Sequence, residues 1–219
     1  MRSEDVLARF GIQLTELDPM PVEVPPSPDW APCRPGALGD DRRAFAGWLR
    51  EWGLLRGVEV GTAGGEFAEV LLDAGLTLTC VDPWVTYPGY TDYRSQRTLN
   101  HVGWRARRRL RPYGDRVAVV RKMSVEAAAD FADGSLDFVF IDANHGLRWV
   151  VEDLCAWAPK VRPGGVVSGH DYAPCERERR QGHHVAEAVR AYADAYGVRP
   201  WFTVGWGGDY TRTWFWVAG

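Results

Sequence analysis

The 219-residue sequence contains few cysteines, no long apolar run and no excess of positive charge. Its four cysteines (Cys33, Cys80, Cys155 and Cys175) are far apart and form no C-x-x-C pair, so neither a structural zinc site nor a disulfide framework is signalled. No stretch approaches the ~18 apolar residues needed to span a bilayer, and the first twenty residues show no apolar leader core. The net charge of −3 gives no general attraction to nucleic acid or to an anionic membrane. These absences predict a cytoplasmic protein with a small-molecule partner.

Proline is concentrated near the N-terminus. Residues 19–35 hold seven of the 14 prolines, and this density opposes the hydrogen bonding of helices and sheet ladders. We therefore assign residues 1–40 to an extended, proline-rich N-terminal arm, which is a candidate surface for homo-oligomer formation. Residues 41–219 are assigned to one domain, because that length suffices for a full core.

Residues 58–72 predict a short buried strand, a glycine-rich turn and an amphipathic helix. Gly61, Gly64 and Gly65 have no Cβ atom and precede the helix, so a ligand can approach both the backbone and the free N–H groups of the first helical turn. The next predicted strand ends in Asp82, 21 positions after Gly61. A carboxylate at this position can accept hydrogen bonds from a ribose diol, so the segment predicts a nucleoside-binding site.

Two details indicate which nucleoside is bound. The glycine spacing is G-x-x-G-G rather than G-x-G-x-x-G, and Glu59 lies in the strand just before the turn. A carboxylate there would repel a pyrophosphate but suits a cofactor that carries a sulfonium and an ammonium group. Here the sequence resembles class I S-adenosylmethionine (SAM)-dependent methyltransferases, whose first motif is an acidic residue, one further residue and a glycine-rich turn. The resemblance implies SAM contacts from Glu59, Gly61, Thr62, Ala63, Gly65, Asp82, Trp84, Met123, Ser124 and Asp142.

Strand and helix patterns alternate along the chain. They predict an α/β fold with a Rossmann-like doubly wound sheet of about seven strands, mostly parallel. Residues 201–206 and 211–217 flank a glycine-rich turn at residues 207–209 and predict a C-terminal antiparallel hairpin. This ending is the pattern of the class I methyltransferase fold. Parallel strands with right-handed crossovers place their carboxyl ends at one edge of the sheet.

Polar side chains follow several of these strands. Asp142 and His145 come after the apolar stretch at residues 136–141, while His170 and Asp171 follow the stretch at residues 166–169. Ser124, after another strand, is expected to be the N-cap of the next helix. All of these side chains should therefore converge near the nucleoside-binding turn.

The segments F-I-D-A-N-H (residues 140–145) and P-G-G-V-V-S-G-H-D-Y (residues 163–172) resemble small-molecule O-methyltransferases of the macrocin and mycinamicin O-methyltransferase type. The resemblance implies that Asp142 and Asp171 bind Mg²⁺ and that His145 takes the proton of the acceptor hydroxyl. His170 stands where the metal-using members carry an acid, and Asn144 stands where an acid is common. The sequence thus leaves open a metal site of Asp142, His170 and Asp171, and a metal-free site in which His145, Asp142 or His170 acts on the proton.

We therefore predict a SAM-dependent methyltransferase that acts on a hydroxyl group of a small metabolite or sugar. One alternative is an NAD-dependent oxidoreductase on a Rossmann-type sheet, which Glu59 and the hairpin disfavour. Another is a nucleic-acid-associated methyltransferase, suggested only by the basic run at residues 105–111, which is more typical of a solvated helix face. In the aromatic loop at residues 83–90, Trp84 and Tyr87 are candidates for stacking on the cofactor, for a lid or for plain surface packing.

Overall fold

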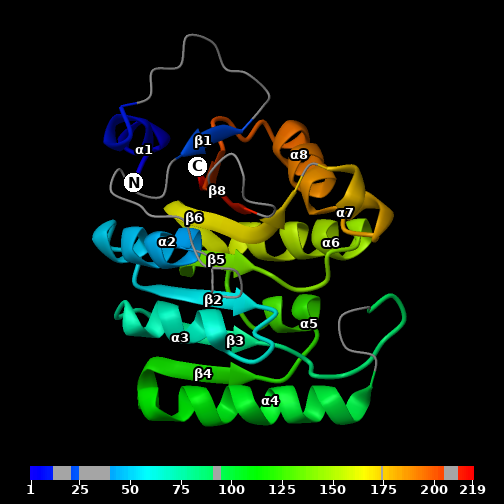
Figure 1. Ribbon diagram of the computed structural model, residues 1–219. Helices are drawn as coiled ribbons and strands as arrows, with labels where there is room; N and C mark the ends of the chain where they lie inside the picture. Colours follow the sequence, from blue (N-terminus) through cyan, green and yellow to red (C-terminus); the bar gives the residue numbers. More distant parts are fainter. Residues whose placement is uncertain (12–20, 25–39, 91–94, 174, 205–211) are drawn as a thin grey trace.

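The computed structural model of the chain describes residues 1–11, 21–24, 40–90, 95–173, 175–204 and 212–219 (Figure 1). The strands are β1 (Val22–Val24), β2 (Arg56–Val60), β3 (Thr77–Val81), β4 (Val117–Val120), β5 (Leu136–Ile141), β6 (Val161–Tyr172), β7 (Phe202–Val204) and β8 (Arg212–Val217). The α-helices are α1 (Ser3–Arg9), α2 (Asp40–Glu51), α3 (Glu66–Asp73), α4 (Gln96–Leu110), α5 (Ser124–Ala128), α6 (Leu147–Trp157), α7 (Glu176–Arg180) and α8 (Val185–Ala195). Two 3₁₀ turns, η1 (Arg111–Arg116) and η2 (Ala158–Lys160), precede β4 and β6.

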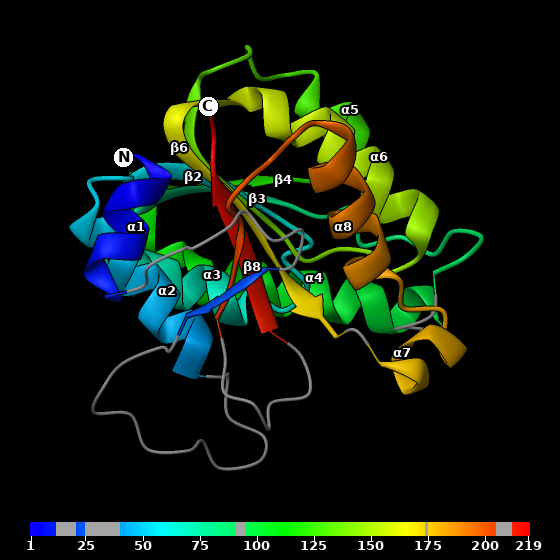
Figure 2. The same ribbon diagram turned by 90° about the horizontal axis from the view of Figure 1, so that it is seen from above.

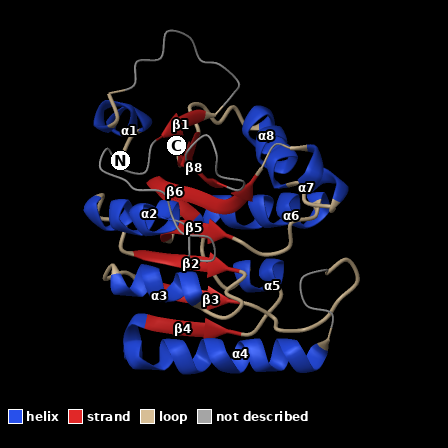
Figure 3. Cartoon of the chain, in the orientation of Figure 1, coloured by secondary structure: helices blue, strands red, loops and turns tan. Residues whose placement is uncertain are grey.

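The strands form one sheet in the order β1-β7-β8-β6-β5-β2-β3-β4 (Figure 3). Among the strands of the described residues, only β8 runs antiparallel to its neighbours, β6 and β7. The predicted Rossmann-like sheet with C-terminal antiparallel strands is therefore confirmed, although the turn at residues 207–209 lies outside the described residues. Because β2, β3, β5 and β6 are parallel, their carboxyl ends lie at the same edge of the sheet.

The arm contributes an eighth strand that the sequence did not predict. Val22–Val24 pairs in parallel with β7, and the Val22 N–H donates to the carbonyl oxygen of Trp201 at 2.9 Å. The expectation that the proline-rich segment forms no ladder is wrong here, because these three residues lie between Pro21 and Pro25 and retain their N–H groups. Val6 of α1 is also fully buried in the core, so these described parts of the arm pack on the domain.

Two hydrophobic layers enclose the sheet. Side chains alternate along β5: Phe138 and Phe140 pack with α2 and α3 on one face, whereas Val139 and Ile141 pack with α5, α6 and α8 on the other. Figure 2 shows the two groups of helices on opposite sides of the sheet. A strand buried on both faces is held rigidly, so the residues that follow β5 have a fixed starting point.

The described residues also settle three smaller points. Ser124 is not an N-cap: Met123 precedes the helix with extended backbone angles, and Ser124 is the first residue of α5. Cys80, Cys155 and Cys175 carry free thiols, and Cys33 lies outside the described residues. None of the described helices combines the length and the apolar character needed to cross a bilayer.

Candidate active site

The glycine turn connects β2 to α3 in a conformation that only glycine can adopt at its first position. Gly61 has φ 91°, and a Cβ atom there would lie 2.1 Å from the carbonyl oxygen of Asp142. Gly65, with φ 79°, immediately precedes α3. The turn therefore lies directly against Asp142, the residue that follows β5, and this contact joins the predicted cofactor loop to the predicted catalytic residues.

Asp82 fixes the same turn from the end of β3. Its Oδ2 accepts a hydrogen bond from the N–H of Ala63 at 2.9 Å, and its Oδ1 accepts one from the N–H of Trp84 at 2.7 Å. Burial raises the pKa of Asp82 to about 6. Asp82 lines the cavity beside the turn, and each carboxylate oxygen has a second lone pair available for a ribose hydroxyl.

Glu59 and Thr62 lie outside the cavity lining. Both side chains are buried, and no well-aligned hydrogen bond to a described residue uses Glu59 Oε2 or Thr62 Oγ1. Burial raises the pKa of Glu59 to about 8. Their contact with the cofactor thus stays a prediction, because the structure places both side chains next to the glycine turn and outside the cavity lining.

Trp84 supports the turn instead of facing the cofactor. The indole is only 1% exposed, its Nε1 donates to the carbonyl oxygen of Ala63 at 2.9 Å, and its ring packs on Gly103 of α4, where a Cβ atom would lie 2.7 Å from it. The predicted stacking of Trp84 on the cofactor is wrong in this conformation. The backbone at Trp84 has φ 43°, a left-handed conformation that is uncommon for a bulky residue.

A cavity of about 410 Å³ lies at the carboxyl edge of the sheet. The predicted site residues that line it are Gly61, Ala63, Asp82, Met123, Ser124, Asp142, Asn144, His145 and Asp171. They come from the carboxyl ends of five strands, β2 to β6, as the parallel topology requires. Gly65 and His170 do not line it. The volume is within the usual range of ~300–1,000 Å³ for small-molecule sites.

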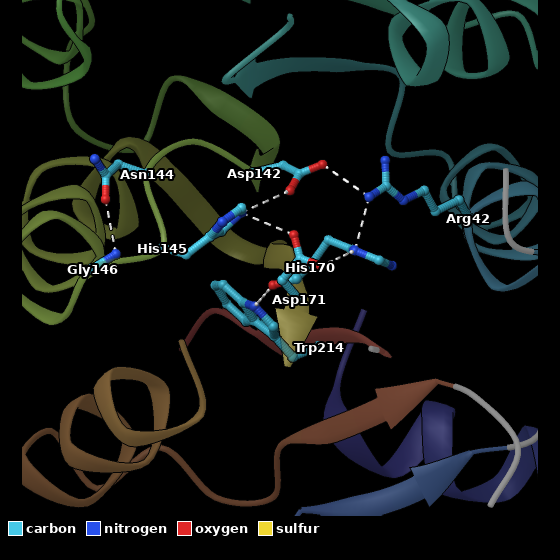
Figure 4. Close-up of polar contacts among 8 residues, drawn as sticks. All are labelled: Arg42, Asp142, Asn144, His145, Gly146, His170, Asp171 and Trp214. Carbon is cyan, nitrogen blue, oxygen red and sulfur yellow. Dashed lines mark hydrogen bonds and ion pairs between the residues drawn. The ribbon is translucent and has the colours of Figure 1, made fainter. Parts of the chain in front are cut away.

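Aromatic side chains form one wall of this cavity. Tyr87 stacks on Tyr90 with ring centroids 5.1 Å apart, and it lies 5.0 Å from the ring of Trp149 on α6. The Asn144 side chain donates to the carbonyl oxygen of Gly89 at 3.0 Å and so ties the aromatic loop to the end of β5. Asn144 therefore holds this loop and points away from the acid–histidine cluster (Figure 4).

The cluster itself centres on His145 (Figure 4). Its Nε2 lies 2.9 Å from Asp171 Oδ2 and 3.9 Å from Asp142 Oδ1, and no aligned hydrogen bond to another described residue uses this nitrogen. Burial alone would lower the pKa of His145, but its contacts with Asp142 and Asp171 outweigh burial and raise that pKa to about 10. Burial acts to raise the pKa of Asp171, but His145 and His170 more than offset it and hold that pKa well below its usual range.

A bulge brings His170 and Asp171 to the cluster. The pairing of β6 with β8 shifts register between Gly169 and Tyr172, and Asp171 has φ 57°. Trp214 holds this irregular backbone, because its Nε1 donates to the carbonyl oxygen of His170 at 3.0 Å. As a result, Asp171 Oδ1 lies 3.2 Å from His170 Nδ1 while Oδ2 faces His145. Asp142, His170 and Asp171 each offer one ligand atom within 4.8 Å of the others, so the predicted metal set does assemble.

Three residues near the site were missed by the sequence analysis. Arg42 of α2 contacts both Asp142 and His170. Asp153 of α6 lines the cavity, is 4% exposed, and has its pKa raised to about 7 by burial. His183 places its ring 4.9 Å from that of His145. Of these three, only Asp153 could have been identified from the sequence. It lies three residues after Val150, so the helical pattern places this acid on the apolar face of its helix.

The sheet order, the glycine turn and the acid at the end of β3 together define a nucleoside-binding methyltransferase fold of class I. The family model described as "Methyltransferase domain" matches residues 58–172, which is more than half of the chain. The chain therefore belongs to this family. It is a SAM-dependent methyltransferase, and the alternative of an NAD-dependent oxidoreductase is wrong.

Solved structures show the same fold at low sequence identity. The O-methyltransferase TomG from Streptomyces achromogenes, involved in tomaymycin synthesis and solved in complex with SAM, is 17% identical, with a TM-score of 0.60 over 84% of this chain and 82% of TomG. A putative O-methyltransferase from Klebsiella pneumoniae is 18% identical, with a TM-score of 0.59 over 85% and 84%. The N-methyltransferase NodS from Bradyrhizobium japonicum WM9 is 18% identical, with a TM-score of 0.52 over 80% and 95%. No curated protein matches the sequence significantly.

Proposed function

We propose that the enzyme transfers the methyl group of SAM to a hydroxyl group of a small metabolite or sugar. The observation that carries this proposal is the position of His145, which lines the same cavity as Gly61 and Asp82. A hydroxyl nucleophile must lose its proton during the transfer, so a histidine within reach of the cofactor is expected for O-methylation.

In this proposal the cavity has a cofactor end and an acceptor end. Gly61, Ala63 and Asp82 hold the methionine and ribose parts of SAM, while Met123 and Ser124 lie at the adenine. Methyl transfer is an in-line displacement, so its rate depends mainly on the alignment of the sulfonium carbon with the acceptor oxygen. Tyr87, Tyr90 and Trp149 suit an acceptor with a flat or apolar face beside its hydroxyl group.

His145 must be neutral to accept the proton. Its pKa of about 10 means that the free enzyme holds it mostly protonated at neutral pH. We propose that bound SAM lowers the pKa of His145 and so favours its neutral form, because the positive sulfonium disfavours a second positive charge nearby. S-Adenosylhomocysteine has no sulfonium and should lower that pKa less.

The test is a screen with SAM that carries a ¹³C-labelled methyl group. Phenols, hydroxylated sugars and amines are incubated with enzyme, and the product is examined by NMR, since the chemical shift of the labelled carbon separates O-methyl from N-methyl groups. O-Methylation of at least one hydroxylated class is the expected result. Exclusive methylation of amines would overturn the hydroxyl assignment.

Two further aspects of partner choice belong to this proposal. A small acceptor is favoured over nucleic acid, because part of the basic run of α4 is engaged within the protein: Arg105 and Arg109 both contact Glu66, and Arg109 Nε lies 3.2 Å from Glu69. Association of two copies through the arm stays a prediction, to be checked by light scattering of the full chain.

A further inference from the structure

The guanidinium group of Arg42 lies inside the acid–histidine cluster. Its Nη2 is 3.0 Å from Asp142 Oδ2 and 2.8 Å from His170 Nδ1, and its Cζ lies 5.5 Å from the ring centroid of Phe67 (Figure 4). The side chain is 16% exposed. Arg42 thus reaches the site from the first turn of α2, a helix that precedes the whole glycine-turn segment in sequence.

These contacts use the atoms that a metal ion would need. A guanidinium group has donors only, so Arg42 is paired with the form of His170 that carries its ring proton on Nε2 and a lone pair on Nδ1. The same nitrogen faces Asp171, which makes it the ligand atom that His170 offers to the cluster. A Mg²⁺ ion bound there would lie about 2.1 Å from its ligands and would compete with Nη2 for that lone pair and for Asp142 Oδ2.

The surroundings of Asp171 lead to the same conclusion. Its Oδ2 lies 2.9 Å from His145 Nε2, and its Oδ1 lies 3.2 Å from His170 Nδ1, so both oxygens already have a neighbour in the cluster. A divalent ion placed among these groups would also lie beside the fixed positive charge of Arg42, and like charges at such short distances repel strongly in a buried site. The donor set therefore fits a guanidinium better than it fits Mg²⁺.

We propose that Arg42 is the resident cation of this site and that the enzyme works without a divalent metal. Arg42 acts as a positioning residue: it orients Asp142 and His170, and through Asp142 it sets the place of His145. This inference rests on the proposed O-methyl transfer for its catalytic meaning, but its central claim concerns which cation the cluster holds.

The first experiment measures metal binding without any acceptor. Metal-stripped enzyme is titrated with Mn²⁺ and followed by electron paramagnetic resonance, while the imidazole NMR signals of His145 and His170 are monitored for paramagnetic broadening. Wild-type enzyme should bind no stoichiometric Mn²⁺ at these residues. Stoichiometric binding with selective broadening of the two histidines would overturn the proposal.

The second experiment measures turnover in EDTA once an acceptor is known. Wild-type activity should be unchanged, and Arg42→Ala should lower kcat by about 10²-fold through misplacement of the site. Arg42→Lys should retain part of the activity, and added guanidinium ion should partly restore Arg42→Ala. Arg43→Ala is the matched control, since Arg43 is the exposed neighbour on the same helix turn.

The outcomes separate this inference from the proposed function. Loss of wild-type turnover in EDTA with recovery in Mg²⁺, or an Arg42→Ala enzyme with normal kcat, would overturn the role of Arg42 and leave O-methylation intact. Calorimetry with S-adenosylhomocysteine tests the cofactor site independently of any metal. If S-adenosylhomocysteine does not bind, the proposed function is refuted. The Mn²⁺ titration would still test whether the cluster holds a metal ion or Arg42.

Discussion

The pH dependence of methyl transfer is the sharpest test of His145 as the proton acceptor. A pKa of about 10 leaves a neutral fraction of only ~10⁻³ at pH 7, because each unit between pH and pKa is a factor of ten. If the neutral imidazole is the reactive form, kcat/KM for the acceptor at saturating SAM should rise about tenfold per pH unit until the pKa of the SAM complex is reached.

The structure also predicts how the ascending limb of this pH profile, the range in which kcat/KM rises with pH, shifts when a charge is removed. Asp171 Oδ2 is the nearest carboxylate oxygen to His145 Nε2, at 2.9 Å. Asp171→Asn removes that negative charge and should shift the limb to lower pH by about 1–3 units, the usual effect of one nearby opposite charge. Such a shift identifies the titrating group, because a purely structural substitution changes the rate without moving the midpoint.

The assay is a continuous measurement of S-adenosylhomocysteine release between pH 6 and pH 10, with SAM saturating at each point. His145→Ala should remove the limb and lower kcat by about 10²–10⁴-fold, while SAM affinity stays nearly intact. His101→Ala, at an exposed position of α4, is the matched control and should leave the profile unchanged. The reasoning is refuted if His145→Ala keeps near-normal kcat and only melts at a lower temperature, or if its limb is unaltered.

Three further predictions concern the cofactor site and stability. Asp82→Ala should weaken SAM binding by about 1.5–3 kcal/mol in calorimetry, and because the pKa of Asp82 is about 6, wild-type affinity should fall as pH drops through that value. Gly61→Ala should lose SAM binding and fold poorly, since the added methyl group meets backbone at 2.1 Å, whereas Gly47→Ala, at a mid-helix glycine with open space around it, should raise the melting temperature. The raised pKa of His145 stabilises the fold fully below about pH 6.5, so the stability gap between wild type and His145→Ala should shrink as pH rises toward 10.

The fold and the cofactor turn could be predicted because local sequence patterns determine both. The apolar run of β5 and the glycines after β2 need no information about distant residues, and parallel topology then brings Asp82, Asp142 and His145 together. Side-chain direction was less predictable. Trp84 follows Asp82 by two positions at the predicted cofactor edge, yet its indole packs on Gly103 of α4, and no sequence pattern specifies that direction.

Arg42 could not be predicted because nothing local distinguishes it from Arg43. The two arginines stand side by side at the start of an amphipathic helix, where charged residues normally face solvent. In the sequence, Arg42 is 100 positions from Asp142 and 128 positions from His170. The packing of α2 against the sheet brings the three side chains together. Long-range ion pairs of this kind depend on tertiary geometry.

The histidine at position 170 and Arg42 belong to one electrostatic arrangement. Three carboxylates around Mg²⁺ would leave one net negative charge. Two carboxylates with one guanidinium, as at Asp142, Asp171 and Arg42, leave the same net charge. Placing an acid back at His170 in the Arg42→Ala background should therefore recreate a hard, negatively charged pocket and produce Mn²⁺ binding that neither single variant shows. If the double variant Arg42→Ala, His170→Asp binds no Mn²⁺ while remaining folded, the charge balance is not what separates this site from a metal centre.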